Sequence, residues 1–363
     1  MQVSIIHRLC LFGLALFMPL LASATPTPQN YGELDLDAFQ KTPRTTWNIE
    51  DFSDRYRATL ELNDEQEVFR PGILRVYDRQ SGAELIQVSS DELVLAIDDK
   101  SGDVKSNVHE LPYGEQSVLI YDDFNFDGIK DLALMDGQFS CYHGPSFQVF
   151  LGTPDGFRHS DSFTELAQNY CGFFDYDAES RTINVSAKDG CCRHWFSTYE
   201  VVNGEPVLKA EREVDYTGVP GISTHTVTWV VDGTKVVSTT QMWEEDDQRQ
   251  VLLSFRLVPS GKRIMLFRPD KTSPVYYAAV NDKDEVDLLY PEGDAQALEY
   301  SSDRHVLSFV RGDTTYRILG DAKGKPLSME VVIKGKTTPL KLQPGSVQGS
   351  LLKVWEAMQE TGP

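Results

Sequence analysis

The sequence predicts an all-β protein with two domains. Short runs of β-branched and aromatic residues recur along its 363 residues, separated by glycine, proline, asparagine and aspartate, and this pattern is typical of strands and turns. A clear helical period occurs only near the C-terminus. With 40% hydrophobic and 25% charged residues, the composition is that of a globular protein. We expect a propeller-like or sandwich N-terminal domain at residues 25–216 and a second β-rich domain at residues 222–363 that ends in a short helix.

The first 24 residues have the pattern of a signal peptide. Arg8 precedes the apolar run Leu9–Leu21, and the small residues that end at Ala24 fit a cleavage site. The run is too short for a membrane span, which needs about 20 apolar residues, and no other run approaches that length. We therefore expect cleavage after Ala24 and an exported protein without a membrane span, located in the periplasm or secreted.

The N-terminal domain is expected to be built from hairpins. Ile73–Tyr77 and Glu84–Val88 flank the turn residues Asp78–Gly82, which predicts two paired strands. Further strands are expected at Glu92–Ile97, Val118–Tyr121, Leu132–Met135, Phe147–Leu151, Thr182–Ala187, Phe196–Val202 and Val207–Glu211.

A dense set of oxygen side chains lies between two of these strands. Oxygens fall at alternate positions, and a glycine, Gly128, follows the third of them, where it permits the positive φ that turns the chain back. Calcium takes six to eight oxygen ligands at about 2.3–2.6 Å, and such alternation aims oxygens at one point. The sequence therefore predicts one Ca²⁺ site. Its ligands would be Asp123, Asn125, Asp127, the backbone carbonyl of Ile129, and Asp131.

The predicted loop differs from an EF-hand. An EF-hand has a bidentate glutamate at its twelfth position and helices on both sides, whereas Leu134 occupies that position here and both flanks are strand-like. Asp131 would then take the place of the missing glutamate. The alternative is a plain hairpin loop without an ion, but its acidic residues would repel one another without a cation.

The loop also carries a resemblance to a known family. Asp123–Leu132, followed by a strand and Val149–Phe157, resembles one FG-GAP (VCBS-type) repeat. Together with the hairpin Tyr176–Thr182, it resembles a family of bacterial periplasmic proteins with a single such loop. At least one member is an immunity protein that inhibits a lysozyme-like peptidoglycan hydrolase delivered by a type IV secretion system. Over residues 91–213, the resemblance implies a calcium-binding inhibitor with a protein partner.

Four cysteines lie outside the signal peptide, Cys141, Cys171, Cys191 and Cys192. An even number in an oxidising compartment predicts two disulfides, and four cysteines allow three pairings. A bond between Cys191 and Cys192 is one of them. We expect instead that each bonds to a different partner, Cys141 or Cys171. A zinc site is disfavoured because no C-x-x-C pair is present.

The second domain is expected to begin after the glycine- and proline-rich segment Thr217–Gly221. Thr224–Val231 and Lys235–Trp243 flank Asp232–Gly233, a strong hairpin signal. Ser350 is expected to cap the C-terminal helix. The other expected strands are Gln250–Val258, Arg263–Phe267, Val275–Val280, Val286–Tyr290, His305–Val310, Thr315–Leu319, Met329–Ile333 and Leu340–Leu342, and the apolar face of the helix comprises Leu351, Leu352, Val354, Trp355 and Met358.

Charge and motifs narrow the functional classes. The chain has 34 basic and 55 acidic residues, a formal net charge of −21, which argues against nucleic acid and anionic membranes as partners. It favours a cationic protein partner, such as a lysozyme-like hydrolase, although acidity also serves solubility. No nucleophile elbow, zinc-protease or phosphate-loop motif is present, so we expect that the protein is not an enzyme. The expected function is a periplasmic calcium-binding inhibitor of a peptidoglycan hydrolase; the alternatives are a structural or adhesion module of the envelope and an unrecognised hydrolase.

Overall fold

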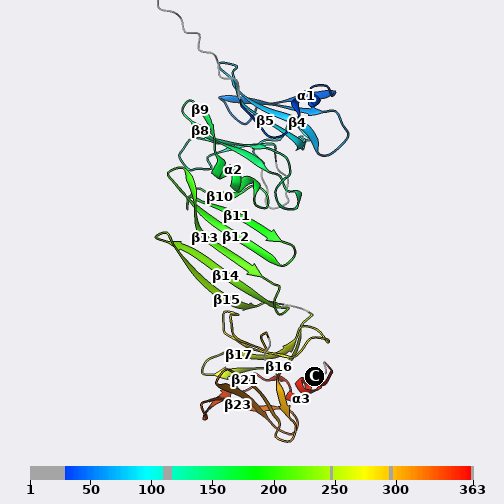
Figure 1. Cartoon of the computed structure of the whole chain (residues 1–363), viewed down its shortest axis with the longest axis vertical. Coiled ribbons are helices and arrows are strands. Elements are labelled where there is room, and N and C mark those ends of the chain that lie inside the picture. Colours follow the sequence, from blue (N-terminus) through cyan, green and yellow to red (C-terminus); the bar gives the residue numbers. More distant parts are fainter. Residues whose placement is uncertain (1–28, 109–116, 246–247, 294–296, 361–363) are drawn as a thin grey trace, which may run out of the picture.

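The computed structural model describes residues 29–108, 117–245, 248–293 and 297–360. The predicted signal peptide lies outside the described residues. Four sheets follow one another along an elongated molecule, in the order of the chain (Figure 1). The predicted all-β class is confirmed, including the short C-terminal helix.

The first sheet has five strands in the order β1-β5-β4-β3-β2. Along β3, side chains alternate between buried and half-buried, as expected for a strand with one face on a core. The predicted hairpin is confirmed: the Asp78 carboxylate accepts a hydrogen bond from the Ser81 backbone at 2.7 Å and closes its turn. The elements are β1 (Asn30–Tyr31), α1 (Leu36–Phe39), β2 (Arg44–Ile49), β3 (Tyr56–Asn63), β4 (Arg70–Asp78) and β5 (Glu84–Leu93).

One predicted strand of this region is wrong in its extent. Instead of running over Glu92–Ile97, β5 ends at Leu93, and Ile97 forms only a single bridge, with Val104. The reason is the turn that follows. The Asp98 carboxylate accepts hydrogen bonds from the backbone of Lys100 and Ser101, both at 2.9 Å. These bonds stabilise a separate turn, which brings Ile97 opposite Val104 and not alongside β4.

The second sheet has four strands in the order β6-β7-β8-β9 and shares one hydrophobic core with the first. Every residue of β7 is buried, which explains the apolar run Leu132–Met135 that follows its first residue, Asp131. Helix α2, which the sequence reading missed, begins at the capping hydroxyl of Ser160 and buries Phe163, Leu166 and Ala167. The elements are β6 (Leu119–Asp122), β7 (Asp131–Met135), β8 (Phe147–Thr153), β9 (Gly156–His159) and α2 (Asp161–Gln168).

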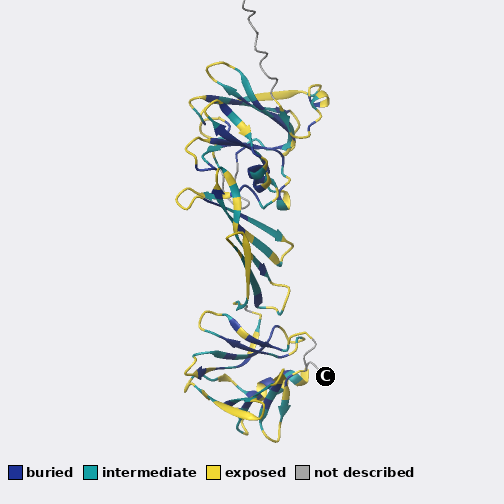
Figure 2. Ribbon diagram, turned by 60° about the vertical axis from the view of Figure 1, so that its left-hand side comes forward, coloured by how far each residue is buried: buried dark blue, intermediate teal, exposed yellow. Residues whose placement is uncertain are grey.

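The third sheet has six antiparallel strands in chain order. Residues 217–221, predicted as a linker, form the turn between β13 and β14 of this sheet, so its pairing continues across them; the division into two domains stays a prediction. Exposed and half-buried residues dominate β13–β15, between the cores of the two ends (Figure 2). The strands are β10 (Asp175–Asp177), β11 (Thr182–Asp189), β12 (Arg193–Val202), β13 (Glu205–Asp215), β14 (Ile222–Val231) and β15 (Thr234–Trp243).

The C-terminal sheet has ten strands, and α3 (Leu351–Glu360) packs on its core. As predicted, Ser350 caps the helix by accepting a hydrogen bond from the Lys353 backbone at 3.2 Å. Among the described residues, no helix is long and apolar enough to cross a membrane. The strands are β16 (Gln250–Val258), β17 (Arg263–Arg268), β18 (Tyr276–Val280), β19 (Val286–Tyr290), β20 (Glu299–Ser301), β21 (Val306–Arg311), β22 (Thr314–Gly320), β23 (Pro326–Ile333), β24 (Lys336–Leu342) and β25 (Gln348–Gly349).

The disulfide pairing corrects our expectation. Cys141 bonds to Cys171, with 4.7 Å between their Cα atoms, and Cys191 bonds to its neighbour Cys192. The Cys171 backbone donates to Ser186 on β11, whereas the Cys191–Cys192 pair lies beyond the end of that strand. Three residues of strand separate Ser186 from that end, a rise of about 10 Å. A disulfide needs Cα atoms within about 7 Å, so the tip of the hairpin does not reach Cys171.

Candidate metal loop and its surroundings

The predicted metal loop is the connection between β6 and β7, which pair up to Asp122 and Asp131. Gly128 has φ +91°, as the sequence reading required, and Phe126 also lies in the left-handed region at φ 59°. These two residues fold the segment back on itself. The loop is therefore a tight hairpin connection and not a helix-flanked site.

Three predicted ligands meet within the loop. The Asp127 backbone N–H donates to Asp123 Oδ1 at 3.1 Å and to Asn125 Oδ1 at 3.0 Å, so these two oxygens converge on one group. Asp123 Oδ2 accepts from the Gly128 backbone at 2.8 Å. Asp127 Oδ1 accepts from the Ile129 backbone at 2.8 Å, and its Oδ2 accepts from the Asn125 amide at 3.1 Å. Backbone donors thus fix the direction of each oxygen side chain.

Asp131 occupies a different position from the other predicted ligands, because it is fully buried. Its Oδ2 accepts from the Phe124 backbone at 2.7 Å and the Asn125 backbone at 3.2 Å, and its Oδ1 accepts from the Gly152 backbone at 2.7 Å. Burial raises the pKa of this carboxyl to about 7, against the effect of the three N–H donors and with a contribution from the charge of Asp123. The side chain ties the start of the loop to β8.

Two further residues position the loop, and the sequence reading did not single them out. Gly152 lies so close to the loop that an added Cβ would stand 2.3 Å from the Lys130 carbonyl oxygen. Arg181, immediately before β11, donates to the Phe126 carbonyl at 2.8 Å. Both lie in segments that matched the family resemblance, which was the available signal.

Aromatic side chains support the loop from the core. The Phe124 ring is fully buried and lies 5.4–5.5 Å from the rings of Phe173, Phe174 and Tyr176. The Tyr176 hydroxyl donates to Asp122 Oδ2 at 2.7 Å. Burial alone would raise the pKa of Asp122. This bond, the Asp123 backbone N–H and the Lys130 ammonium group together lower it. Asp122 therefore joins the first residues of the loop to β10.

The donor set suits a hard divalent cation in its chemistry, because carboxylate and amide oxygens have two lone pairs each and backbone donors occupy only part of them. A buried carboxyl with a raised pKa beside Asp123 is also a site whose charge a cation would stabilise. Within the described ranges, however, no group of three or more His, Cys, Asp or Glu side chains is arranged to hold a metal ion. The calcium assignment stays a prediction.

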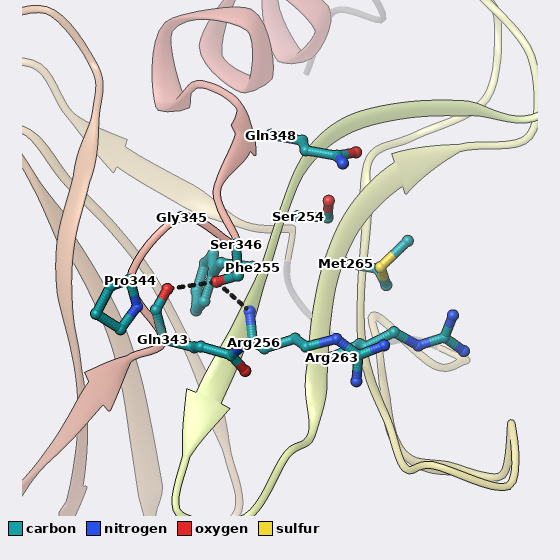
Figure 3. A pocket seen from close by; sticks show the side chains of 10 residues that line it. All are labelled: Ser254, Phe255, Arg256, Arg263, Met265, Gln343, Pro344, Gly345, Ser346 and Gln348. Atoms are coloured by element: carbon teal, nitrogen blue, oxygen red, sulfur yellow. Dashed lines mark hydrogen bonds between the residues drawn. The ribbon is translucent and has the colours of Figure 1, made fainter.

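A separate cavity lies in the C-terminal sheet, with a volume of about 420 Å³ (Figure 3). Arg256 and Arg263 are directly opposite each other on β16 and β17 and line it. Ser346 closes one side, since its hydroxyl donates to the Gln343 carbonyl at 2.7 Å and accepts from the Arg256 backbone at 3.0 Å. Arg263 is paired with Asp284, so the cavity holds a partly neutralised cationic pair.

Comparison with known proteins does not assign this chain to a family. No protein-family model matches the sequence, and no curated protein matches it. A Xanthomonas type IV secretion system related protein of known structure is 20% identical with a TM-score of 0.42, and the match covers 53% of this chain and 92% of that chain.

Two other solved structures show weaker likeness. A prolyl endopeptidase is 10% identical with a TM-score of 0.22, covering 83% of this chain and 42% of that one. Hsv2p of Kluyveromyces lactis is 8% identical with a TM-score of 0.19, covering 85% and 99%. All three TM-scores lie below 0.5, so these similarities establish neither the fold nor the function of this chain.

Proposed function

We propose that the protein is an exported calcium-binding protein that binds and inhibits a peptidoglycan hydrolase. The observation that carries the proposal is the β6–β7 loop, in which oxygen side chains at alternate positions are oriented by backbone donors. Calcium would be held by Asp123, Asn125, Asp127, the Ile129 carbonyl and Asp131. The two disulfides are typical of an exported chain.

Calcium would make the loop rigid. Bound at these oxygens, it would supply positive charge to carboxylates that otherwise repel one another, one of which is buried. Because Asp131 also bonds to Gly152, an ordered loop fixes β8 relative to β6 and β7. A surface that is already ordered loses less conformational entropy on binding, which increases affinity for a partner.

Two features support a hydrolase as the partner. The loop and the hairpin at Tyr176–Thr182 resemble a family that includes an inhibitor of a lysozyme-like enzyme. The net charge of −21 favours association with a cationic protein by long-range attraction.

The test is inhibition of a purified lysozyme by the mature protein, measured in calcium and in chelator. Inhibition in calcium that is lost in chelator supports the whole proposal. Equal inhibition in both conditions supports the inhibitor but removes calcium from its mechanism. No inhibition and no binding, across lysozyme-like hydrolases, contradicts the proposal.

A calcium-stabilised structural or adhesion module of the envelope is the second candidate. The elongated column of sheets favours it, because the β13–β15 region buries little and spaces the two cored ends apart (Figure 2). Under this alternative, the protein would be retained on isolated cell envelopes and would leave hydrolase rates unchanged. The expectation that the chain is not an enzyme also stands as a proposal, to be checked by assaying peptidoglycan turnover by the purified protein.

A further inference from the structure

We infer that the chain contacts its hydrolase through an exposed aromatic surface, which we call the aromatic face. This surface would enter the carboxylate-lined active-site cleft of the enzyme. This inference rests on the proposed function and names the contact surface. The aromatic face consists of Tyr142, Lys188, Phe196 and Arg212, and lies on one side of the β11–β12–β13 part of the third sheet.

The centre of the aromatic face is a strained, exposed tyrosine. Tyr142 has φ 58° and ψ 35°, and the next residue, His143, has φ 58°, so two consecutive residues with side chains are in the left-handed region. Such residues are uncommon and persist where the surroundings hold them, often at ligand-binding sites. The disulfide of the preceding residue, Cys141, fixes this segment to Cys171. Tyr142 nevertheless remains 52% exposed, so burial of its ring does not account for the strain.

A second set of contacts fixes the direction of the ring. The Tyr142 hydroxyl donates to the Gly190 carbonyl at 3.0 Å, at the tip of the β11–β12 hairpin. The Lys188 ammonium lies 4.2 Å from the ring centroid, within the range of a cation–π contact. The ring is therefore held in place before any partner binds, as in well-ordered interface anchors.

A second aromatic–cation pair lies on the same side of the sheet. Arg212 is directly opposite Phe196 in the β12–β13 register, and its guanidinium carbon is 4.7 Å from the ring centroid. Phe196 is opposite Ser186, two residues from Lys188, and alternate residues of a strand share a face. The two cations and their rings thus present one surface, and Phe196 is 40% exposed.

The aromatic face borders a cavity. Phe139, which precedes Tyr142 in the same connection between β7 and β8, is also 62% exposed. A cavity of about 380 Å³ lies beside Phe196 and is walled by Cys171–Phe173 and Ser186. Exposed aromatic side chains around a cavity are typical of protein contact sites.

Charge identifies the occupant. The chain as a whole has a net charge of −21, yet the aromatic face pairs its rings with an ammonium and a guanidinium. A glycoside hydrolase that cleaves cell-wall glycan has two carboxyl groups in its cleft, which accommodates sugar rings. An exposed tyrosine ring beside a cation matches both properties of that cleft. Direct binding of glycan is less favoured, because a cation already covers one face of each paired ring.

The test compares Tyr142→Gly with the wild-type protein in inhibition of a lysozyme. Glycine adopts the left-handed conformation without strain, so the variant should have an unchanged or higher melting temperature, while its inhibition constant should rise at least tenfold. Lys188→Gln should weaken inhibition in the same direction. Phe69→Ala is the matched control, since Phe69 is 47% exposed in the connection between β3 and β4 of the first sheet and should leave inhibition unchanged.

The outcomes separate the two proposals. Inhibition by wild type that Tyr142→Gly and Lys188→Gln retain in full overturns the aromatic face and leaves the proposed function standing. A wild-type protein that neither binds nor inhibits lysozyme-like hydrolases overturns both. Tyr142-dependent binding to purified, enzyme-free peptidoglycan, with no effect on hydrolase inhibition, overturns the assignment of the occupant.

Discussion

Replacing Asp127 with alanine should reduce the free energy of unfolding by different amounts in the presence and in the absence of calcium. Its carboxylate accepts one bond from the Ile129 backbone and one from the Asn125 amide, at 2.8 and 3.1 Å. The residue is exposed, so in Asp127→Ala both donors can bond to water. The loss of free energy of unfolding without calcium should then be only about 1 kcal/mol.

With calcium, the same substitution should cost more. Exported modules bind calcium with Kd values of about 10⁻⁴–10⁻³ M. Free calcium at a hundredfold excess over Kd stabilises the folded protein by about 2.7 kcal/mol. Loss of a charged ligand that weakens binding by about a hundredfold leaves roughly 0.4 kcal/mol of this stabilisation. Asp127→Ala should therefore lose about 3 kcal/mol in total in calcium, roughly three times the loss in chelator.

Thermal unfolding in calcium and in chelator measures this difference. At about 2–4 °C per kcal/mol for a unit of 150–250 residues, the melting temperature should fall by about 6–12 °C in calcium and by about 2–4 °C in chelator. Asp155→Ala in the exposed β8–β9 turn is the control and should change neither value by more than about 2 °C. Equal losses for Asp127→Ala in both conditions would refute the calcium assignment.

Three further predictions concern stability. Burial raises the pKa of Asp136, so the folded state binds this proton more tightly than the unfolded state does. The contribution of Asp136 to the free energy of unfolding should therefore fall as the pH rises above about 4. Denaturant unfolding of Asp136→Asn at several pH values should show a weaker pH dependence than the wild type. Gly152→Ala should cost about 1–3 kcal/mol in denaturant unfolding because its Cβ meets a backbone carbonyl, whereas Gly218→Ala, which meets nothing within 4 Å, should cost less. Leu351→Ala should cost about 2–5 kcal/mol because the side chain is fully buried, and Leu352→Ala, 37% exposed, about 1 kcal/mol; similar losses for the two would contradict the packing of α3.

Strand positions were predictable where turn chemistry and apolar runs coincide. The β14–β15 hairpin illustrates this: Asp232 and Gly233 both have positive φ, as a two-residue turn requires, and the strands extend from them as predicted. β2 and β3 were missed, although the alternating burial of β3 is regular. Helix α2 was missed because it is short and its stability depends on burying Phe163 and Leu166 against β8, a contact that local sequence does not contain.

The spacing of its oxygen side chains located the loop, but the sequence did not predict which of these residues are buried and which remain accessible. Asp123 and Asp131 are both aspartates of one motif, yet the first is half-buried and the second is fully buried. That difference arises from tertiary structure, because the backbone of Gly152 on β8 bonds to Asp131. Spacing predicts which oxygens face one another; burial, which sets the pKa of Asp131, depends on the strand that packs across them.

The same distinction explains why the aromatic face was not visible in the sequence. Tyr142 and Phe196 are far apart in the sequence, and the Cys141–Cys171 disulfide and the β11–β12 hairpin place them on one surface. Had each of Cys191 and Cys192 bonded to one of those cysteines, Cys141 and Cys171 would not be joined to each other, and the bond that fixes the segment before Tyr142 would be absent. The observed pairing leaves Gly190 free to accept the bond from Tyr142. The disulfide pattern that corrected our expectation is therefore the feature that allows the proposed contact surface to form.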